Sequence, residues 1–563
     1  MKSNQNHQSP STDEPNVPAS LSRRSFLGMG AIGAGSLGAL ALLGCTPQQD
    51  AARMGNADAA TTAAQELAPA DRTEECDVVV VGLGTSGAVA AATAAREGAH
   101  VIGLDRVSSM AGTNAAMVSG VFAVESKPEL KYDNHLTTRE AFDYIWSNTH
   151  YQANAAALRA LLPATGKAID LMEEGGVAFM YAFEGVDETA PMLYRGGHIY
   201  ATSGKERADS LQNMIDINGV DARWDVQATD ILTEEGKIVG VRYQDGSDAV
   251  DVKAANIIIA TGGFIHNEEM LKQHFSGSLM YCTGNLYNDG SGITMAQAAG
   301  AQIGKNFSTS INESGACNMK SSDQFVSLSD SNATPVFSLP LFGGLLVNKQ
   351  GVRFMDEGKM AKETMYCGEP LLREGVYYAI IDQAMVDKLA TTPVLDFISE
   401  DAFNNMAPGV QAGFQGKTLS ALPEKLETGI EEGWIWKADS AQELAEASGL
   451  ADLAKTLDAY NGFCQSGDDA EMYKEAQFLK ELSSGPLYAI ELQIAAWITL
   501  GGIKTDGQCR AVDEKGNPLD GLFVVGADGD FWTVPYFQGG SCQGFCVGSG
   551  YVAGVAAAQK TSA

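Results

Sequence analysis

The stretch that decides the fold, residues 76–87, reads CDVVVVGLGTSG. Its four consecutive valines have the β-branched, wholly apolar character of a buried parallel strand. The strand leads directly into Gly82, Gly84 and Gly87, and a helix is predicted over residues 88–98. In this spacing the first glycine makes a tight turn, the second lets backbone N–H groups approach a pyrophosphate, and the third lets helix and strand pack closely. The segment therefore predicts a phosphate-binding turn at a helix N-terminus.

The residues that follow strengthen this prediction, because a GxGxxG motif alone is a weak signal. A second strand is predicted over residues 100–104, and it leads into Asp105 and Arg106. An acidic residue about twenty positions beyond the turn is where the ribose hydroxyls of a dinucleotide need an acceptor. We therefore predict a dinucleotide site formed by Asp105, Arg106 and the turn residues Gly82, Gly84, Thr85, Ser86 and Gly87.

Further segments indicate which dinucleotide is bound. They are the small-residue stretch 111–120, the buried strand and glycine turn 256–264, the helix start 288–292 and the final strand 521–528. In this order the segments resemble the flavoprotein superfamily that contains soluble fumarate reductases, urocanate reductases and 3-ketosteroid dehydrogenases. The resemblance covers about residues 76 to 560 and implies FAD rather than NAD.

The resemblance also implies an architecture. The fold class is α/β, with a discontinuous, Rossmann-like FAD-binding domain at residues 76–306 and 497–563 and an inserted α+β cap at 307–496. Asp528 stands where the family usually has Glu to hold the ribityl chain, and Gly539-Gly540-Ser541 starts a helix aimed at the flavin. The other cofactor contacts implied in this way are Gly112, Thr113, Ser119, Gly120, Ala260, Thr261, Gly262, Asp289 and Ser541.

The expected substrate site differs from that of a fumarate reductase. Positions where that family clamps and protonates a dicarboxylate are occupied here by Asn312, Ala361, Ile498 and Phe537. Burying a dicarboxylate without charged partners would cost several kcal/mol per carboxylate, which is on the order of the free energy needed to desolvate an ion. The substitutions therefore argue against a C4-dicarboxylate, although Lys362, beside Ala361, is a candidate displaced acid.

The segment before the last glycine pair, residues 532–540, more closely resembles the 3-ketosteroid dehydrogenase branch of this superfamily. Tyr536 lies four residues before Gly540, and that branch uses a Tyr hydroxyl and a Gly N–H at this spacing to polarise a substrate carbonyl. Such an oxyanion hole stabilises the enolate that forms when a hydride adds to the carbon β to a carbonyl. The catalytic Tyr that the branch also uses is replaced here by Ala361, and Tyr366 is a candidate replacement.

The sequence therefore predicts a reductase that transfers a hydride from FAD to an activated C=C bond. The predicted substrate is a bulky, non-dicarboxylate enone, unsaturated lactone or enoyl compound, and an external cytochrome or quinol-linked donor supplies the electrons. Three alternatives stay open: a 3-ketosteroid-type dehydrogenase, a fumarate- or urocanate-like reductase, and a non-catalytic flavin-binding lipoprotein.

The N-terminus predicts export. Residues 22–27, SRRSFL, precede an apolar stretch and resemble a twin-arginine signal, and residues 42–45, LLGC, resemble a lipobox. We expect a signal at 1–45, a linker at 46–75, and a cell-envelope protein whose membrane contact is a possible lipid on Cys45. The net charge of −32 among 563 residues argues against nucleic-acid binding.

The nine cysteines carry little information on metals. No CxxCH haem motif occurs, and the single closely spaced pair, Cys542 and Cys546, is better explained as helix packing than as a cluster site. We predict no metal.

Overall fold

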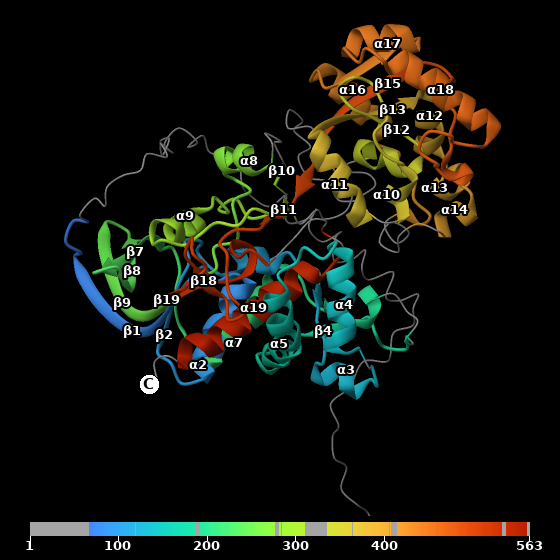
Figure 1. Ribbon diagram of the computed structural model, residues 1–563. Coiled ribbons are helices and arrows are strands. Elements are labelled where there is room, and N and C mark those ends of the chain that lie inside the picture. The colour runs from blue at the N-terminus through green and yellow to red at the C-terminus, as the bar shows by residue number, and fades with distance from the viewer. Residues whose placement is uncertain are drawn as a thin grey trace, which may run out of the picture.

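The computed structural model forms two bodies joined through several crossing segments (Figure 1). The structure describes residues 67–118, 120–134, 136–186, 188, 192–275, 281–282, 284–309, 335–362, 364–404, 406, 414–531, 536 and 538–559. The predicted signal, most of the linker, Ser119, Asn312 and Phe537 lie outside this part of the chain, as do the side chains of Ala361 and Tyr366.

The larger body is built on an eight-stranded sheet. Its order is β18 (Arg510–Val512), β19 (Pro518–Val524), β9 (Asp248–Ile259), β1 (Arg72–Val81), β2 (Val101–Leu104) and β6 (Asp221–Arg223). Strands β1, β2, β6, β9 and β19 run parallel, whereas β18 and the hairpin β7 (Gln227–Glu234) and β8 (Lys237–Asp245) add antiparallel pairs. The valines of β1 are almost fully buried at the centre, as expected for a strand covered on both faces.

Helices pack on this sheet through small residues. Helix α2 (Thr85–Arg96) follows the glycine turn, and α19 (Ser541–Gln559) lies against it and against α5 (Ala155–Glu174) (Figure 1). A Cβ at Gly550 would overlap the carbonyl oxygen of Ser86, and one at Gly554 would lie 2.6 Å from that of Ala90. The small residues of α19 therefore let it approach α2 at backbone distance.

The remaining elements of the larger body surround this core. A three-stranded sheet has the order β3 (Gly120–Phe122), β5 (Gly197–Tyr200), β4 (Phe179–Tyr181). The helices are α3 (Lys127–Lys131), α4 (Thr138–Asn148), α6 (Met192–Arg195), α7 (Gly204–Ile217), α8 (Glu268–His274) and α9 (Ser291–Ala298), with short 3₁₀ turns η1 (Met110–Gly112), η2 (Asn114–Ala116) and η5 (Gly526–Asp528). No helix in the described residues is long and apolar enough to cross a membrane.

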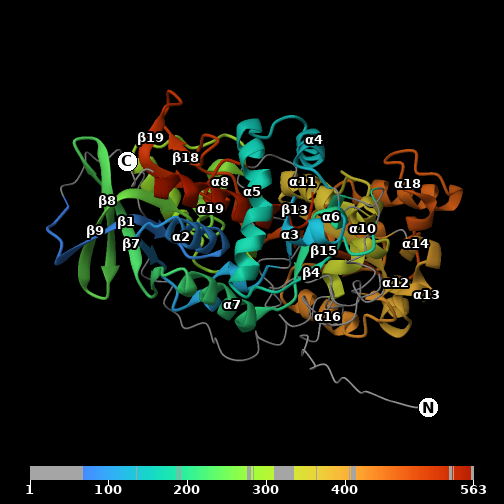
Figure 2. The same cartoon turned by 90° about the horizontal axis from the view of Figure 1, so that it is seen from below.

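The second body is an α+β unit on a four-stranded antiparallel sheet. The order is β12 (Leu345–Val347), β13 (Val376–Asp382), β15 (Leu487–Gln493), β14 (Ile435–Ala438). Around it lie 3₁₀ helices η3 (Pro335–Phe342) and η4 (Ala476–Phe478) and helices α10 (Gly358–Lys362), α11 (Thr364–Glu374), α12 (Gln383–Thr391), α13 (Val394–Phe397), α14 (Glu400–Asn404), α16 (Leu422–Glu431), α17 (Ala441–Ser448) and α18 (Leu453–Ser466) (Figure 2).

Two short strand pairs mark where the chain passes between the bodies. Strand β10 (Tyr281–Cys282) pairs with β16 (Ala495–Ala496), and β11 (Ser308–Thr309) pairs with β17 (Thr499–Leu500). The strands of the second sheet all lie within the predicted cap at 307–496. The predicted α/β fold with an inserted α+β unit is confirmed, while the domain limits stay predictions.

Several predicted element limits differ from the structure. The final strand, predicted over 521–528, is β19, which begins at Pro518 and ends at Val524, and residues 526–528 form the 3₁₀ turn η5 instead. Strand β1 begins at Arg72, inside the expected linker, because residues 72–76 pair with β9 and Arg72 forms an ion pair with Asp245 at 2.6 Å. Helix α2 begins at Thr85 and ends at Arg96, earlier than predicted at both ends. It begins early because Gly84 has the extended backbone of an N-cap, so that Thr85, Ser86 and Gly87 form the first turn.

Candidate cofactor and active site

The glycine turn has the backbone geometry that its sequence predicts. Gly82 has φ +97°, and its N–H donates to the Leu104 carbonyl at 2.8 Å. A Cβ at Gly87 would overlap the Gly82 carbonyl oxygen, so glycine is required there for the helix to close on the strand. A Cβ at Gly84, in contrast, would meet no atom within 4 Å. The N-terminus of α2 therefore faces open space beside Gly84, as an anion-binding helix start requires.

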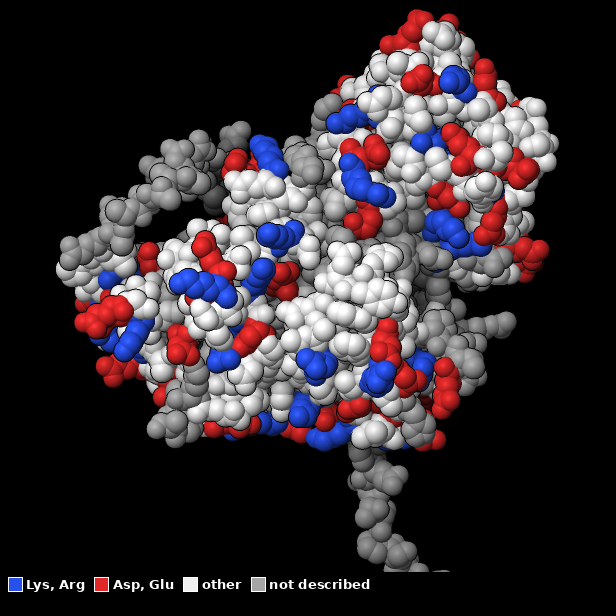
Figure 3. Space-filling model, in the orientation of Figure 1, with Lys and Arg blue, Asp and Glu red and all other residues white. Residues whose placement is uncertain are grey.

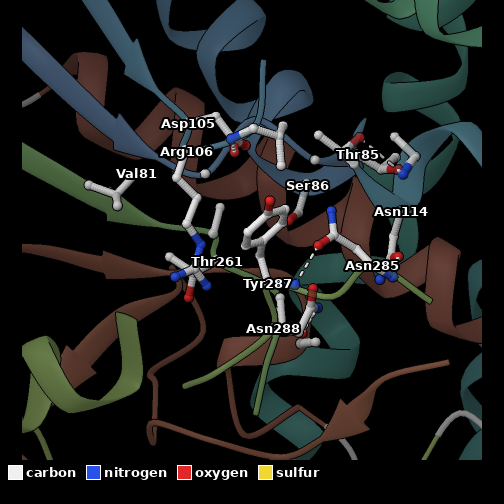
Figure 4. Close-up of a pocket in the computed structure, with 18 of the residues that line it drawn as sticks. Val81, Thr85, Ser86, Asp105, Arg106, Asn114, Thr261, Asn285, Tyr287 and Asn288 are labelled. Carbon is white, nitrogen blue, oxygen red and sulfur yellow. Dashed lines mark hydrogen bonds between the residues drawn. The ribbon is translucent and has the colours of Figure 1, made fainter. Parts of the chain in front are cut away.

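That open space is a cavity of about 890 Å³, a volume that includes the solvent at its open mouth (Figure 4). Ten predicted cofactor residues line it: Gly82, Gly84, Thr85, Ser86, Asp105, Arg106, Thr113, Ala260, Thr261 and Gly262. They come from the carboxyl ends of parallel strands β1, β2 and β9 and from the segments that follow them. This is the edge of an open α/β sheet where ligands bind.

Asp105, the predicted ribose acceptor, lines the cavity at the end of β2. Its carboxylate accepts hydrogen bonds from the N–H groups of Leu83 at 2.7 Å and Val107 at 3.1 Å. Burial raises the pKa of Asp105, and these backbone hydrogen bonds act in the opposite direction. The two contacts fix the carboxylate against the glycine turn, and each oxygen retains a lone pair for a ligand hydroxyl.

Arg106 reaches across the cavity from the next position. Its guanidinium forms an ion pair with Asp289 at 2.8 Å and lies 5.4 Å from the ring centroid of Tyr287, whose side chain projects into the space in Figure 4. Although burial raises the pKa of Asp289, Arg106 and the Ser291 N–H hold it below its usual value. Asp289 does not line the cavity. The structure thus places it where it orients Arg106.

Asp528 lies behind the cavity wall rather than in its lining. It is fully buried, and its carboxylate accepts from the Thr261 N–H, the Thr261 hydroxyl at 2.9 Å, and the N–H groups of Gly262 at 3.0 Å and Gly263 at 2.8 Å. Burial raises the pKa of Asp528, and these four hydrogen bonds lower it. Unlike the ribityl contact that the resemblance implies, Asp528 fixes the turn after β9 from behind.

Other predicted residues also stand outside the lining. Gly87 and Gly112 pack under the turns, Gly120 pairs with Ile199 of β5, and the Ser541 hydroxyl donates to the Gln538 carbonyl at 2.6 Å. Sequence reasoning did not single out Asn285, Tyr287, Gln543 and Cys546 as cofactor contacts, although all four line the cavity. Asn114 and Asn288 also line it, and they lie within the predicted flavin segments 111–120 and 288–292. A hydrogen bond joins the loops that carry two of these asparagines, because Asn114 Oδ1 accepts from the Asn285 N–H at 2.6 Å. Their concentration at 285–288, just before Asp289, was the available signal.

The start of α19 forms the other end of the site. The Gly540 carbonyl accepts from the N–H groups of Phe122 and Gly544, both at 2.9 Å, while no partner for its own N–H is found in the described part of the chain. Tyr536 is buried, and Ile498 lines the cavity. Gln538 is 4% exposed, and neither its Oε1 nor its Nε2 has a partner in the described residues.

Comparison with known proteins identifies the family. A family model described as an FAD binding domain matches residues 77–543. The chain belongs to this FAD-binding family. Its cofactor is therefore FAD, and the protein is an FAD-dependent oxidoreductase, as predicted.

Curated relatives and a solved structure agree with this assignment. A vinyl phenol reductase of Lactiplantibacillus plantarum is 26% identical over 86% of this chain and 97% of its own. A digoxin reductase of Eggerthella lenta is 25% identical over 91% of each chain. The structure of a 3-ketosteroid Δ1-dehydrogenase from Sterolibacterium denitrificans, 16% identical, has a TM-score of 0.61 over 87% of this chain and all of that one, and shows the same fold. The predicted superfamily is confirmed.

The residues present suit FAD at both ends of the cavity. The α2 N-terminus and the open face of Gly84 suit a pyrophosphate, and Asp105 suits a ribose. At the other end, the Oε1 of Gln543 is buried, lines the cavity and has no partner in the described residues. Buried polar atoms are rarely left without partners, so the Gln543 amide is a group that a polar ring system in the cavity would satisfy.

Two further candidates from the sequence have defined positions. Lys362, the candidate displaced acid, forms an ion pair with Glu475 at 2.5 Å and lies over the Phe478 ring, so its ammonium is held within the second body. Cys542 and Cys546 are both buried on α19, one helical turn apart, and the described residues contain no group of three metal-ligating side chains.

Proposed function

We propose that the protein is an exported FAD-dependent reductase that acts on the activated C=C bond of a bulky, uncharged substrate such as an enone, an unsaturated lactone or an enoyl compound. When bound, FAD supplies the hydride-transfer chemistry. The names of two of the relatives support this class, since vinyl phenol and digoxin are both uncharged molecules with a C=C bond.

One observation carries the choice of an uncharged substrate. Among the described residues that line the cavity, Asp105 and Arg106 are the only charged ones, and both lie at the ribose end. The opposite end is lined by Ile498, Ala527 and the neutral amide of Gln543. Ile498 stands at one of the positions where a fumarate reductase would clamp a carboxylate, so a dicarboxylate bound beside this end of the cavity would lack a charge-assisted hydrogen bond there.

The residues around Gly540 provide the proposed chemistry. We assign the Tyr536 hydroxyl and the Gly540 N–H to the substrate carbonyl, where they would stabilise the negative charge that develops on oxygen. Gly540 has φ +81°, and its backbone lies so close to β3 that a Cβ at this position would be 3.1 Å from the Phe122 nitrogen. This close packing fixes the orientation of the Gly540 N–H before substrate binds.

Electrons would reach FAD from a separate cytochrome or quinol-linked donor. The chain has 70 acidic against 38 basic residues, and Figure 3 shows acidic side chains spread over both bodies with basic ones interspersed. A net negative surface favours association with a basic partner at low ionic strength. Export by the twin-arginine route and a lipid on Cys45 would place the protein in the cell envelope beside such donors.

The test compares Tyr536→Phe with the wild type. We expect the Phe variant to bind FAD normally and its reduced form to be reoxidised by a steroid enone about 100-fold more slowly, the usual effect of losing one oxyanion donor. Gly540 is untouched in this variant, so some rate should remain. Equal rates for the two proteins would remove Tyr536 from the mechanism. An enone that oxidises neither protein would count against the proposed substrate class.

A further inference from the structure

One buried arginine has no carboxylate partner among the described residues. Arg195, Arg207, Arg242 and Arg353 are each less than 10% exposed. Arg195 pairs with Glu140, Arg242 with Asp251, and Arg353 with Asp469 and Glu357. Arg207, which is 3% exposed, forms no ion pair with any carboxylate in the described residues.

Neutral groups hold the Arg207 side chain instead. Its Nε donates to the Thr202 carbonyl at 3.0 Å, a second nitrogen donates to the same oxygen, and a third donates to the Val118 carbonyl. The guanidinium carbon lies 4.4 Å from the centroid of the Tyr200 ring. Burial lowers the pKa of Arg207 to about 10, which leaves the side chain charged at neutral pH. The Tyr200 hydroxyl and the Thr202 hydroxyl are themselves buried without partners in the described residues.

This charge lies beside a segment that forms part of the cavity wall. Arg207 belongs to α7, which packs against η1 and η2, and residues 113–115 of that segment line the cavity. Val118, whose carbonyl Arg207 holds, stands two residues before Gly120. Gly540 packs against that glycine, because a Cβ at Gly540 would lie 3.7 Å from the Gly120 oxygen. The cation therefore holds Val118, which lies between the cavity-lining residues 113–115 and Gly120, the residue against which Gly540 packs.

An uncompensated buried cation is costly, because desolvation of an ion takes several kcal/mol that only a nearby negative charge repays. FAD gains negative charge when it is reduced, and a fixed positive charge in a medium of low dielectric constant stabilises that form. We propose that Arg207 is a positioning residue that holds the Val118 segment and supplies the positive charge that raises the reduction potential of the bound FAD. This inference requires FAD but no particular substrate, so it stands or falls separately from the proposed alkene reduction.

The test is the reduction potential of FAD in Arg207→Gln, Arg207→Lys and the matched control Arg242→Gln, each measured as the full FAD-loaded protein against a reference dye. In the Gln variant we expect at least a tenfold fall in the equilibrium constant for two-electron reduction, a shift of about 30 mV to more negative potential. The Lys variant, which keeps the charge, should restore most of the potential. The control, in which Arg242 of β8 pairs with Asp251 of β9, should match the wild type, because neither residue lines the cavity or contacts the Val118 segment.

Three results would overturn the inference. The first is an Arg207→Gln protein that binds FAD at the wild-type potential, and the second is an Arg207→Lys protein displaced as far as the Gln variant. The third is failure of both variants to retain FAD, which would make Arg207 a purely structural residue. Should only the Gln variant lose FAD, a wild-type potential in the Lys variant would support the role of the charge.

Discussion

Replacement of Asp528 by Asn should destabilise the fold strongly, although the two side chains have nearly the same shape. The carboxylate is fully buried and accepts four hydrogen bonds, three of them on Oδ2 and one, from the Gly263 N–H, on Oδ1. An Asn side chain has one acceptor oxygen. If that oxygen faces Thr261, the amide NH₂ faces the Gly263 N–H, and two buried donors are left without acceptors.

Each such donor costs about 1–3 kcal/mol, so we expect the free energy of unfolding to fall by about 2–6 kcal/mol. FAD affinity should fall as well, because Thr261 and Gly262 line the cavity. Urea unfolding of the FAD-free protein measures the first effect, and fluorescence titration with FAD measures the second. Asp513→Asn is the matched control: that carboxylate accepts two backbone N–H groups in a solvent-accessible turn, where water replaces a lost partner, so its loss should be far smaller. A loss below about 1 kcal/mol for Asp528→Asn would refute the assigned role.

Three further predictions concern the glycine turn, the partly buried Asp530 and Lys362 in the second body. Gly84→Val should leave the FAD-free fold intact but weaken FAD binding by about a hundredfold, because the valine methyl groups would enter the open space of the cavity. Gly87→Ala should instead lower the free energy of unfolding by about 1–3 kcal/mol, because its Cβ would overlap the Gly82 carbonyl oxygen. Equal thermal shifts for the two FAD-free variants would contradict this contrast. Burial raises the pKa of the Asp530 carboxyl from 3.8 to about 6. The folded state therefore binds the carboxyl proton more tightly than the unfolded state does, and the protein loses stability as the pH rises from about 4 to 6. Asp530→Asn should therefore raise the unfolding free energy by about 1–3 kcal/mol at pH 8 and by little at pH 4, and a gain that does not vary with pH would count against it. Lys362→Met should change the rate of flavin reoxidation by an alkene less than about twofold, because Glu475 holds the ammonium; a fall of about a hundredfold would make Lys362 the proton donor.

The strand, glycine turn and helix at the start of the folded chain could be predicted because their signals are local. Four valines, three spaced glycines and a following acidic residue each report on a backbone requirement that neighbouring residues do not change. Ten of the predicted residues accordingly line one cavity. FAD could be predicted for a similar reason, because the resemblance rests on short local segments that occur in a fixed order along the chain.

The rest depended on contacts between distant segments. The pairing of Arg72 with β9 and the seating of Asp528 behind Thr261 each join residues more than 150 positions apart, and no local pattern reports them. Because Asp528 is shorter than the Glu that the family usually has at this position, the sequence indicated only that its contact with the ribityl chain would differ. Arg207 belongs to no motif, and only the structure shows that it is buried with no carboxylate partner among the described residues.

The central claim is that FAD in this protein reduces uncharged alkenes and not dicarboxylates. The most direct test is anaerobic reoxidation of the chemically reduced, signal-free protein, followed at the flavin absorbance, with fumarate, urocanate, a steroid enone, an unsaturated steroid lactone and 4-vinylphenol offered separately. The proposed function predicts rapid reoxidation by one or more of the uncharged compounds and none by the two acids. Rapid reoxidation by fumarate would contradict the account, because it would require charged groups at the end of the cavity that Ile498 and Gln543 line.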